Sequence, residues 1–497
     1  MGREIMKYED DSLALHTDLY EVNMAYTYWK KGNADKRAVF EVYYRSNPFG
    51  MGYTIFAGLE RVVDYIKNLS FTESDLAYLK NEIGFEDDYI EYLRNWRFRG
   101  TIRAMREGEI AFANEPLMQV EGPILDCQII ETALLNVINF QTLIATKASK
   151  VKTAAAGDIV MEFGARRAQE MDASLWGARA AYIGGVDSTS HTRASKLFEI
   201  PASGTHAHAL IQAYRDEYQA FKAYAETHDN CVFLVDTYDS IESGVPNAIR
   251  VANEFKDKKY FNFVGVRLDS GDLSYQSKRV REQLDEAGYP DAKIFASNDL
   301  DSETIQSLKM QGAKIDVWGV GTKLITAFDQ PALGAVYKIV SVEGKDKKMH
   351  HTLKLTANLA KISTPGKKQV WRIRSQNDTK PEGDYITLDH ERPDQKDELF
   401  MFHPQFPYIN KTVTDFIARP LLIDIFVDGE LIYDLPSLEE IRSYTRDRLA
   451  EQYEEHRRIL NPEQYPVDLS KELYDAKVDT INYYRDKPYD AIEPDKF

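Results

Sequence analysis

The residues with the clearest chemical potential lie in four short segments, each placed after an apolar, β-branched run. The segments are Glu162–Arg167, Pro201–His208, Arg267–Asp272 and Gly319–Thr322. They contain paired arginines, two histidines, an arginine near two carboxylates, and a glycine loop. Guanidinium forks bind carboxylates and phosphates, and glycine loops let backbone N–H groups approach a phosphate. Together these groups indicate phosphoryl or phosphoribosyl chemistry and argue against a redox or peptide-cleaving site.

The histidine segment has several interpretations. Ser203 and Thr205 are good capping residues, so we expect a helix to begin there and to present backbone N–H groups to an anion. His208 could accept a phosphoryl group, because a neutral imidazole nitrogen is nucleophilic near neutral pH. Two ordinary histidines at a helix start would have the same sequence. His206 and His208 could also form a metal pair, although no partner ligands are evident.

The other three segments are equally open when each is taken alone. The arginines of Arg166–Arg167 either hold a carboxylate or phosphate or form salt bridges with acidic neighbours. Arg267 suits an anion, and Asp269 and Asp272 suit a ribose hydroxyl or Mg²⁺, but the same residues also make an ordinary turn. Gly319–Thr322 is either a phosphate cradle or a plain turn. The combination of the four segments, and no single one, favours a shared anion site.

The elements that must position these segments alternate between strands and helices in the middle of the chain. Strand-like runs cover 158–163, 198–201, 231–235, 263–266, 293–296 and 315–318, and helical segments cover 247–255, 273–287 and 302–310. This alternation predicts βαβ units and a parallel sheet. In such folds the loops after the strands form the active site, which places all four segments at one edge.

The flanks mix helices with strands and polar loops. Helices are expected at 19–29, 58–66, 74–96 and 438–460, and strands at 37–44, 101–104, 335–342, 370–374 and 421–427. Lysine-rich stretches at 344–348 and 366–368 are expected to be solvated turns. We therefore expect an α/β barrel over 125–335. Residues 1–124 and 336–497 would build a mixed α+β domain around it, ending in a charged helix.

Composition excludes several classes of protein. The chain has 497 residues, a formal net charge of −17, 43% hydrophobic and 28% charged residues, which is an ordinary globular mixture. The acidic balance argues against a nucleic-acid-binding surface and requires any basic site to be local. Cys127 and Cys231 show no metal-binding spacing. No secretory signal is evident and no apolar run approaches the roughly 20 residues of a membrane span, so we expect a cytoplasmic protein.

Taken in order, the motifs resemble those of the nicotinate phosphoribosyltransferases. They are Thr17-Asp-Leu-Tyr20, Asn47-Pro-Phe-Gly50, Glu162–Gln169, Gly184–Ser188, Gly204–His208, Val266–Asp272, Ala296–Asp299 and Gly319–Thr322. Each motif is weak alone, but eight in family order over residues 13–340 are specific.

This resemblance implies the irregular α/β barrel of the type II phosphoribosyltransferases, packed with a mixed domain, in a homodimer with shared active sites. It implies transfer of phosphoribosyl from phosphoribosyl pyrophosphate (PRPP) to nicotinate, which gives nicotinate mononucleotide and pyrophosphate for NAD salvage. ATP hydrolysis would be coupled through a phosphohistidine. Mg²⁺ would accompany PRPP and ATP, with no tightly bound metal held by the protein. No nucleic acid or membrane partner is implied.

The resemblance also assigns roles to single residues. His208 matches the histidine that ATP phosphorylates. Tyr20 and Phe163 match the aromatic residues that sandwich the pyridine ring, with Tyr20 of the partner subunit reaching across the dimer. Arg267 and Thr205 match nicotinate contacts.

Other matches concern the phosphoribosyl group. Arg166 matches a PRPP contact, Asp269 a group that holds ribose hydroxyls, and Asp187 an acidic residue near the base pocket. The cradle for the 5-phosphate matches Asn298, Gly319, Gly321 and Thr322. His206 departs from the family pattern, which has an apolar residue there; it is either a packing variant or a group that alters the pKa or access of His208.

Two other functions stay open at this point. A nicotinamide-using relative would share the phosphohistidine and the ring sandwich, although its motif near the FGxR strand and its spacing differ. A non-catalytic ligand-binding protein on the same scaffold would have no need of His208, Arg267 and the glycine loop together. For the enzyme, we expect catalysis by positioning and by stabilising an oxocarbenium-like sugar and departing pyrophosphate, because the pyridine nitrogen needs no general base.

Overall fold

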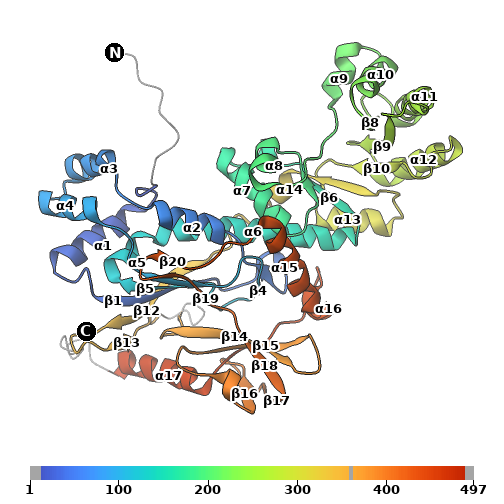
Figure 1. Cartoon of the computed structure of the whole chain (residues 1–497). Coiled ribbons are helices and arrows are strands. Elements are labelled where there is room, and N and C mark those ends of the chain that lie inside the picture. The colour runs from blue at the N-terminus through green and yellow to red at the C-terminus, as the bar shows by residue number, and fades with distance from the viewer. Residues whose placement is uncertain (1–12, 357–361, 487–497) are drawn as a thin grey trace. The chain divides into compact units, whose positions relative to one another are not determined.

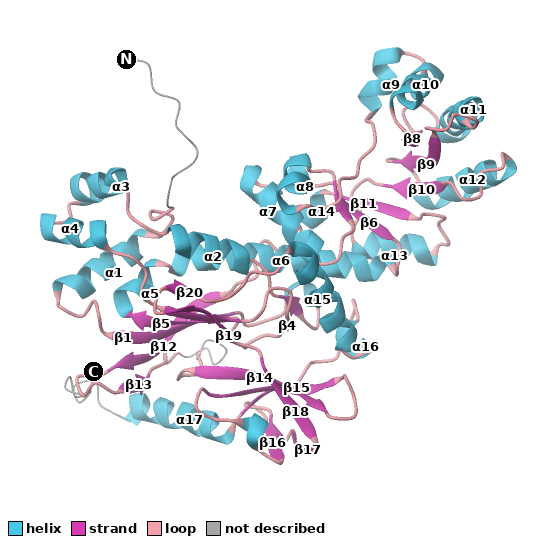
Figure 2. Ribbon diagram, viewed as in Figure 1, coloured by secondary structure: helices cyan, strands magenta, loops and turns pink. Residues whose placement is uncertain are grey.

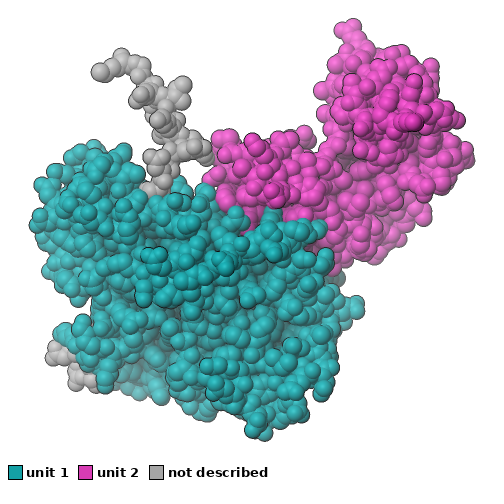
Figure 3. Space-filling view, viewed as in Figure 1, with its two compact units in different colours: residues 1–142, 333–497 teal, residues 143–332 magenta. Residues whose placement is uncertain are grey.

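A computed structural model describes residues 13–356 and 362–486 of the chain. It divides into two compact units, unit 1 with residues 1–142 and 333–497, and unit 2 with residues 143–332 (Figure 3). The first boundary falls inside the 25-residue helix α6 (Glu131–Ala155), because this helix continues from one unit into the other. Unit 2 thus covers residues 143–332, and the barrel domain expected over 125–335 stays a prediction.

Unit 2 is built on a six-stranded parallel sheet with the order β7-β6-β11-β10-β9-β8 (Figure 2). The strands are β6 (Ile159–Glu162), β7 (Ser188–Thr189), β8 (Asn230–Leu234), β9 (Asn262–Leu268), β10 (Lys293–Ala296) and β11 (Val317–Val320). Five of them lie within two residues of the expected runs. The strand expected at 198–201 is absent, because Phe198 ends a helix and Glu199 takes a left-handed φ of 56°.

Helices alternate with these strands along the chain (Figure 1). They are α7 (Glu170–Ile183), α8 (Thr192–Phe198), α9 (His208–Tyr214), α10 (Glu217–Thr227), α11 (Val245–Phe255), α12 (Leu273–Glu286), α13 (Ser302–Met310) and α14 (Thr322–Ile325). Aspartate caps fix two helix starts: Asp272 accepts from Tyr275 N–H at α12, and Asp301 from Thr304 N–H at α13. Because a helical connection separates successive strands, all strands run in the same direction, and their carboxyl ends lie on the same side of the sheet.

Unit 1 contains a seven-stranded sheet with the order β13-β12-β1-β5-β3-β19-β20. Its strands are β1 (Arg37–Tyr43), β3 (Thr101–Ala104), β5 (Met118–Pro123), β12 (Val336–Glu343), β13 (Met349–His351), β19 (Ile423–Val427) and β20 (Glu430–Leu431). The N-terminal strands β1, β5 and β3 lie in the middle of this sheet, and strands of the C-terminal flank lie on both sides of them. At the two junctions β1 pairs with β12 and β3 pairs with β19, both antiparallel. The two flanks therefore share one sheet.

A second sheet of unit 1 comes mainly from the C-terminal flank. Its order is β17-β16-β21-β15-β14-β18, with β14 (Lys368–Ser375), β15 (Pro381–Leu388), β16 (Glu398–Phe402), β17 (Asn410–Thr414), β18 (Phe416–Pro420) and β21 (Val467–Leu469). A short pair, β2 (Thr54–Ile55) and β4 (Ile110–Ala111), completes the strands.

The helices of unit 1 are α1 (Leu19–Lys30), α2 (Leu59–Asn68), α3 (Glu73–Tyr78), α4 (Asp87–Asn95), α5 (Ile124–Ile129), α15 (Leu438–Glu451), α16 (Glu454–Arg457) and α17 (Lys471–Asp486).

Three expectations for the flanks need correction. The helix expected over 74–96 is interrupted by a π turn (Leu79–Ile83) and by Gly84, whose φ of +86° ends it. The charged helix expected over 438–460 ends at Glu451, and α17 was not expected at all. The turn at 366–368 is not fully solvated: Lys368 is buried and its Nζ donates to Glu41 Oε2 at 2.9 Å. Across the described residues, no helix combines the length and apolar character needed to cross a membrane.

Candidate active site

The carboxyl ends of five strands lie on the same side of the parallel sheet. The loops that follow these strands come from distant parts of the chain. Because neighbouring parallel strands run in the same direction, their carboxyl ends meet there. The residues that begin or lie in these loops are Phe163, Asp236, Asp269, Ser297 and Gly321. Most of the residues singled out from the sequence lie in or beside these loops, and their contacts form one connected cluster.

Arg267, one residue before the end of β9, is the centre of this cluster. Its Nε donates to Ser297 Oγ at 2.8 Å, its Nη1 to Thr205 Oγ1 at 2.9 Å and its Nη2 to Asp269 Oδ1 at 3.0 Å. Ser297 also donates to Asp269, so three side chains form a closed ring of contacts. The Arg267 side chain is 16% exposed. A guanidinium fixed in this way has a defined orientation for binding a carboxylate.

Phe163 follows β6, and its ring packs against the neighbouring strand. Its N–H donates to Val320 O of β11 at 2.9 Å. A Cβ at Gly319 would lie 2.7 Å from the Phe163 ring, so a residue without a side chain is needed there. The Arg267 guanidinium carbon lies 5.5 Å from the centre of the same ring. An aromatic face and a guanidinium therefore converge, which suits a planar ring that carries an anionic group.

Glu162 fixes the turn that carries Phe163. It is buried, and it accepts hydrogen bonds from Thr189 Oγ1 at 2.6 Å and from Gly164 N–H. Burial raises the pKa of this carboxyl above its usual range, although the two hydrogen bonds oppose the shift. Its contacts with β7 and with its own turn give it a positioning role next to the cluster.

His208 is the first residue of α9 and lies beside the carboxylates of the cluster. Its Nδ1 is 3.0 Å from Thr237 Oγ1, and its Nε2 is 3.9 Å from Asp236 Oδ1 and 3.8 Å from Asp269 Oδ2. Two carboxylates therefore lie beside one nitrogen of the imidazole ring, and the Thr237 hydroxyl lies beside the other. Asp269 also binds Arg267, so one carboxylate connects the histidine with the guanidinium.

Asp236 belongs to this cluster, although the sequence analysis did not name it as a site residue. Its side chain is 3% exposed, and its Oδ2 accepts from Asp269 N–H at 2.8 Å and Ser270 Oγ at 2.6 Å. Its Oδ1 is buried and has no hydrogen-bond partner among the described residues. The sequence did contain a signal, because Asp236 is the first polar residue after the apolar run 231–235. Ser297 was missed in the same way after β10.

The sequence predicts one amphipathic helix from the histidine segment to about residue 225, but the helix that forms begins later and is shorter. Its N-cap is Ala207, with no side-chain cap, so Ser203 and Thr205 do not cap it. It is only seven residues long, because Arg215 takes a left-handed φ of 57° before α10 begins. The Thr205 hydroxyl instead accepts from Arg267. The expected anion site at a long helix N-terminus is therefore replaced by side-chain contacts.

The loop after β10 has a strained backbone. Asn298 has a φ of +94° and Asp299 a φ of +43°, in a region that non-glycine residues adopt at a cost in free energy. Such strain persists where the surrounding structure enforces it, and it is common at ligand sites. Asn298 is exposed, and Gly321 and Thr322 follow the adjacent strand β11. The predicted phosphate loop and Asn298 therefore lie at neighbouring strand ends.

Two predicted residues of unit 2, Arg166 and Asp187, do not take part in the hydrogen bonds that join this cluster within the described part of the chain. Arg166 is exposed on the turn that follows Phe163. Asp187 lies at the opposite end of the sheet, where its Oδ2 accepts from Lys152 Nζ at 2.6 Å and from Val160 N–H at 2.8 Å near the start of β6. Its carboxylate is thus engaged in fixing β6, away from the strand ends that carry Arg267.

Tyr20 belongs to unit 1, as the second residue of α1. Its side chain is 48% exposed, whereas Val22 and Ala25 on the same helix are buried. Partial burial and the carboxylates of Glu131 and Glu21 raise the pKa of the Tyr20 hydroxyl. It therefore keeps its proton and offers an exposed aromatic face.

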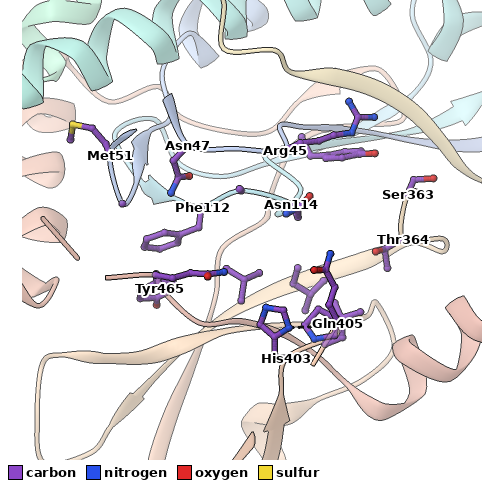
Figure 4. A pocket seen from close by; sticks show the side chains of 18 of the residues that line it. Arg45, Asn47, Met51, Phe112, Asn114, Ser363, Thr364, His403, Gln405 and Tyr465 are labelled. Carbon is purple, nitrogen blue, oxygen red and sulfur yellow. Dashed lines mark hydrogen bonds between the residues drawn. The ribbon is translucent and has the colours of Figure 1, made fainter. Parts of the chain in front are cut away.

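A cavity of about 630 Å³ lies in unit 1, between residues of its two sheets (Figure 4). Its volume is that of a small-molecule site. Phe112 and Tyr465 stack beside it with ring centres 3.6 Å apart, and Arg45, Asn114 and His403 also line it. None of the site residues predicted from the sequence lines this cavity. No group of three or more His, Cys, Asp or Glu side chains in the described residues could hold a metal ion.

Comparisons with known proteins agree along the chain. Models of the nicotinate phosphoribosyltransferase (NAPRTase) family match residues 15–139 (N-terminal domain), 159–382 (family) and 367–477 (C-terminal domain). A nicotinate phosphoribosyltransferase of Bacillus subtilis is 55% identical, covering 98% of this chain and 99% of that protein, and one of Dictyostelium discoideum is 37% identical, covering 93% and 87%. The crystal structure of human nicotinic acid phosphoribosyltransferase has a TM-score of 0.82 at 30% identity, covering 93% of this chain and 99% of that chain. The chain belongs to the nicotinate phosphoribosyltransferase family.

Proposed function

We propose that this protein transfers the phosphoribosyl group of PRPP to nicotinate, releasing nicotinate mononucleotide and pyrophosphate, and couples the transfer to ATP hydrolysis through phosphorylation of His208. The observation that carries the proposal is the contact of Arg267 with Phe163, Thr205 and Asp269, with His208 beside the same carboxylate. Near-full-length similarity to a protein named for this reaction supports the choice of substrate.

Nicotinate is proposed to bind between Phe163 and the Arg267 guanidinium. The pyridine ring would stack on Phe163, and its carboxylate would pair with Arg267, whose other contacts fix the fork. Thr205, held by the Arg267 guanidinium, would contact the same carboxylate. This arrangement recognises a planar ring with a negative substituent, which nicotinamide lacks.

The transfer step needs little proton chemistry. The lone pair of the pyridine nitrogen forms the new bond to C1 of the ribose, while the C1–O bond to pyrophosphate breaks and its electron pair leaves with the pyrophosphate. Asp269 would hold the ribose hydroxyls and stabilise the positive charge that develops on the sugar. Mg²⁺ is proposed to enter with PRPP and to lower the charge on the leaving group, with Asp236 and Asp269 as neighbouring carboxylates.

The 5-phosphate is assigned to the loops after β10 and β11. Asn298, Gly319, Gly321 and Thr322 lie in or beside these loops, and the strained φ of Asn298 supports a ligand role. Arg166 is proposed to contact PRPP from the turn after Phe163, where its guanidinium is exposed. For Asp187 the pairing with Lys152 favours a structural role over the base-pocket role that the family pattern implies.

Coupling to ATP is assigned to His208. The carboxylates of Asp236 and Asp269 would orient its imidazole and stabilise the charge that it carries when it accepts and releases a phosphoryl group. Hydrolysis of the phosphohistidine would pull an unfavourable equilibrium toward nicotinate mononucleotide.

The assembly is proposed to be a homodimer in the cytoplasm. Tyr20 of the partner subunit would cover the second face of the pyridine ring, which agrees with its exposed ring. The parallel sheet is proposed to be the irregular barrel of the type II phosphoribosyltransferases. Two free, buried cysteines, Cys127 and Cys231, are consistent with a reducing compartment. No nucleic acid or membrane partner is proposed.

A matched pair of assays tests the function. The protein is supplied with PRPP, Mg²⁺ and ATP, and with either nicotinate or nicotinamide. We expect product with nicotinate and an acid-labile phosphate on the protein after exposure to ATP; His208→Ala is expected to lose that phosphate and the coupling while retaining slow transfer. Preference for nicotinamide would establish the other enzyme. If ATP leaves no phosphate and His208→Ala changes nothing, a non-catalytic binding protein is the better account.

A further inference from the structure

The parallel sheet of unit 2 has two terminal strands, β7 and β8, and the segment 201–206 lies between them. On the β7 side this segment pairs by backbone hydrogen bonds: Thr189 N–H donates to Pro201 O at 3.1 Å, and Ser203 N–H donates to Thr189 O at 3.0 Å. On the β8 side, the described residues make no backbone hydrogen bond between this segment and the strand. Without some other contact, the segment 201–206 would therefore not be joined to β8.

His206 supplies that link. Its Nε2 accepts a hydrogen bond from the buried backbone N–H of Leu234 at 3.1 Å. The next residue, Val235, donates its N–H to Arg267 O of β9 at 3.1 Å, so the N–H of Leu234 points away from β9 toward the open edge of β8. The imidazole nitrogen thus takes the place that a carbonyl of a further strand would occupy.

The surroundings of the ring suit this acceptor role. His206 is 8% exposed and packs against Phe221 and Tyr224, with ring centres 5.8 Å and 5.0 Å away. Burial lowers the pKa of His206 to about 4, with smaller contributions from Arg267 and His208. The ring is therefore neutral at ordinary pH, and the Nε2 lone pair is available to the N–H of Leu234.

The link joins the two chain segments that hold the reactive groups. Thr205, which binds Arg267, precedes His206, and His208 follows two residues later. On the strand side, Leu234 is followed closely by Asp236 and Thr237, the residues beside His208. A shift of the 201–206 segment along β8 would therefore change the distances from His208 to Asp236 and Thr237.

We propose that His206 is a positioning residue that closes the sheet between β7 and β8 and holds His208 and Thr205 in register with Asp236 and Arg267. Its effect on catalysis rests on the function proposed above. The contact also bears on the interpretation of His206 and His208 as a metal pair. Because Nε2 of His206 accepts from Leu234 N–H, His206 does not present that nitrogen to a metal shared with His208.

Three variants of the full-length protein test this role. His206→Phe keeps an aromatic ring against Tyr224 but removes the acceptor, and it leaves a buried N–H unpaired. His206→Gln is the conservative variant, because its side-chain oxygen can reach the place of Nε2. His228→Phe is the matched control: His228 stacks on the same Tyr224 at 4.1 Å but is exposed and does not contact Leu234.

The first readout is catalytic. For His206→Phe we expect kcat/KM for nicotinate to fall on the order of 10- to 100-fold, and more ATP to be hydrolysed per product formed, because ångström-scale misplacement has effects of this size. His206→Gln should recover most of both quantities, and His228→Phe should match the wild type. Equal losses in His206→Phe and His228→Phe, or no recovery in His206→Gln, would overturn the proposal.

The second readout does not depend on activity. Backbone amide exchange is measured at Leu234 and at residues 203–208. We expect faster exchange at both places in His206→Phe and wild-type protection in His206→Gln. If the wild type shows no activity with nicotinate, the proposed function fails while the exchange result still decides the positioning role. Unchanged protection in a folded His206→Phe protein would refute that role.

Discussion

Two clusters in this protein use the same residue types in opposite ways. In unit 1, Arg372 binds Asp384 through Nε at 2.9 Å and Nη2 at 2.7 Å, and Glu109 through Nη1 at 2.7 Å. In unit 2, Arg267 binds Asp269 together with two neutral hydroxyls. Arg372 is held by four hydrogen bonds and Arg267 by three, so the number of hydrogen bonds alone hardly distinguishes the two arginines.

Exposure and charge balance do separate the two clusters. The side chains of Arg372, Glu109 and Asp384 are at most 3% exposed, whereas Asp269 is 27% and His208 37% exposed. Arg372 faces two carboxylates, and Nη2 also donates to Ile110 O at 2.7 Å, so its charge is fully balanced. Arg267 faces one carboxylate and remains accessible. A fully paired buried arginine holds the fold together, and a partly paired one at a strand edge can bind a substrate anion.

The net charge of the chain sharpens this contrast. The substrates proposed are anions, and a protein of charge −17 repels them at long range. Binding must therefore depend on local cations such as Arg267 and Arg166, and on the backbone of the glycine loop. The net charge therefore reflects the chain as a whole, whereas the site combines Arg267 with the carboxylates of Asp236 and Asp269.

The same substitution in both clusters gives the strongest test. Arg372→Met leaves Glu109 and Asp384 buried without their cation, and breaking such a pair costs about 3–5 kcal/mol in the free energy of unfolding. Chemical denaturation measures this loss. We expect any folded fraction to retain wild-type kcat/KM. An Arg372→Met protein as stable as the wild type would contradict the structural role of Arg372.

Arg267→Met is expected to show the reverse. Loss of the carboxylate partner should lower kcat/KM for nicotinate by the equivalent of about 2–5 kcal/mol, with a change of less than about 1 kcal/mol in unfolding free energy. Initial rates with nicotinate and with an uncharged pyridine analogue measure the selectivity. An equal loss for both bases would contradict the carboxylate role of Arg267.

The buried cluster should lose stability as the pH falls below about 4.5. Burial alone would raise the pKa of Glu109, but Arg372 and Arg419 hold it at about 2, below its ordinary value of 4.5. A depressed pKa in the folded state stabilises the protein above about pH 4.5, and this contribution, up to about 3 kcal/mol, is lost as the pH falls toward 2. Glu115 does not titrate in this window, because burial and Asp384 keep its pKa well above the ordinary value.

Unfolding of the wild type and of Glu109→Gln between pH 2 and 6 measures this contribution. The variant should be less stable near neutral pH and should show a flatter loss of stability on acidification. Parallel pH profiles would assign the acid sensitivity to other carboxylates.

The sequence predicted the regular parts of unit 2 well, because their determinants are local. The apolar run at 293–296 and the aspartate cap at Asp301 mark β10 and α13 at the bounds that the structure shows. In the flanks, β1 pairs with β5 and also with β12, which lies about 300 residues further along the chain, and periodicity does not encode such pairings. The break at Gly84 was missed although glycine is a local signal for the end of a helix, and helix α17 was missed as well.

The site, like the fold, contains residues that the sequence identifies and residues that only the structure identifies. Arg267 and His208 stand out by residue type and by their place after strands. Asp236 and Ser297 are ordinary polar residues in sequence, and their roles follow from the register of β8, β9 and β10, which brings them to His208 and Arg267. The Arg372 network went unnoticed because each member looks like a surface charge until the sheets are assembled.

Removal of one hydroxyl group from each cluster tests the difference between the two clusters with the smallest expected effect. Ser297→Ala removes an acceptor of Arg267 Nε and a donor to Asp269 in the strand-edge cluster, and Tyr444→Phe removes a donor to Glu109 in the buried one. Each change removes two hydrogen bonds with charged groups, since Tyr444 also accepts from Arg419, and the expected loss is on the order of 1.5–3 kcal/mol. We expect Ser297→Ala to lose that amount in kcat/KM, because Arg267 is less firmly oriented, and Tyr444→Phe to lose it in unfolding free energy. If both variants lose stability alone, the strand-edge cluster is also structural, and Arg267 is not held in place for a ligand.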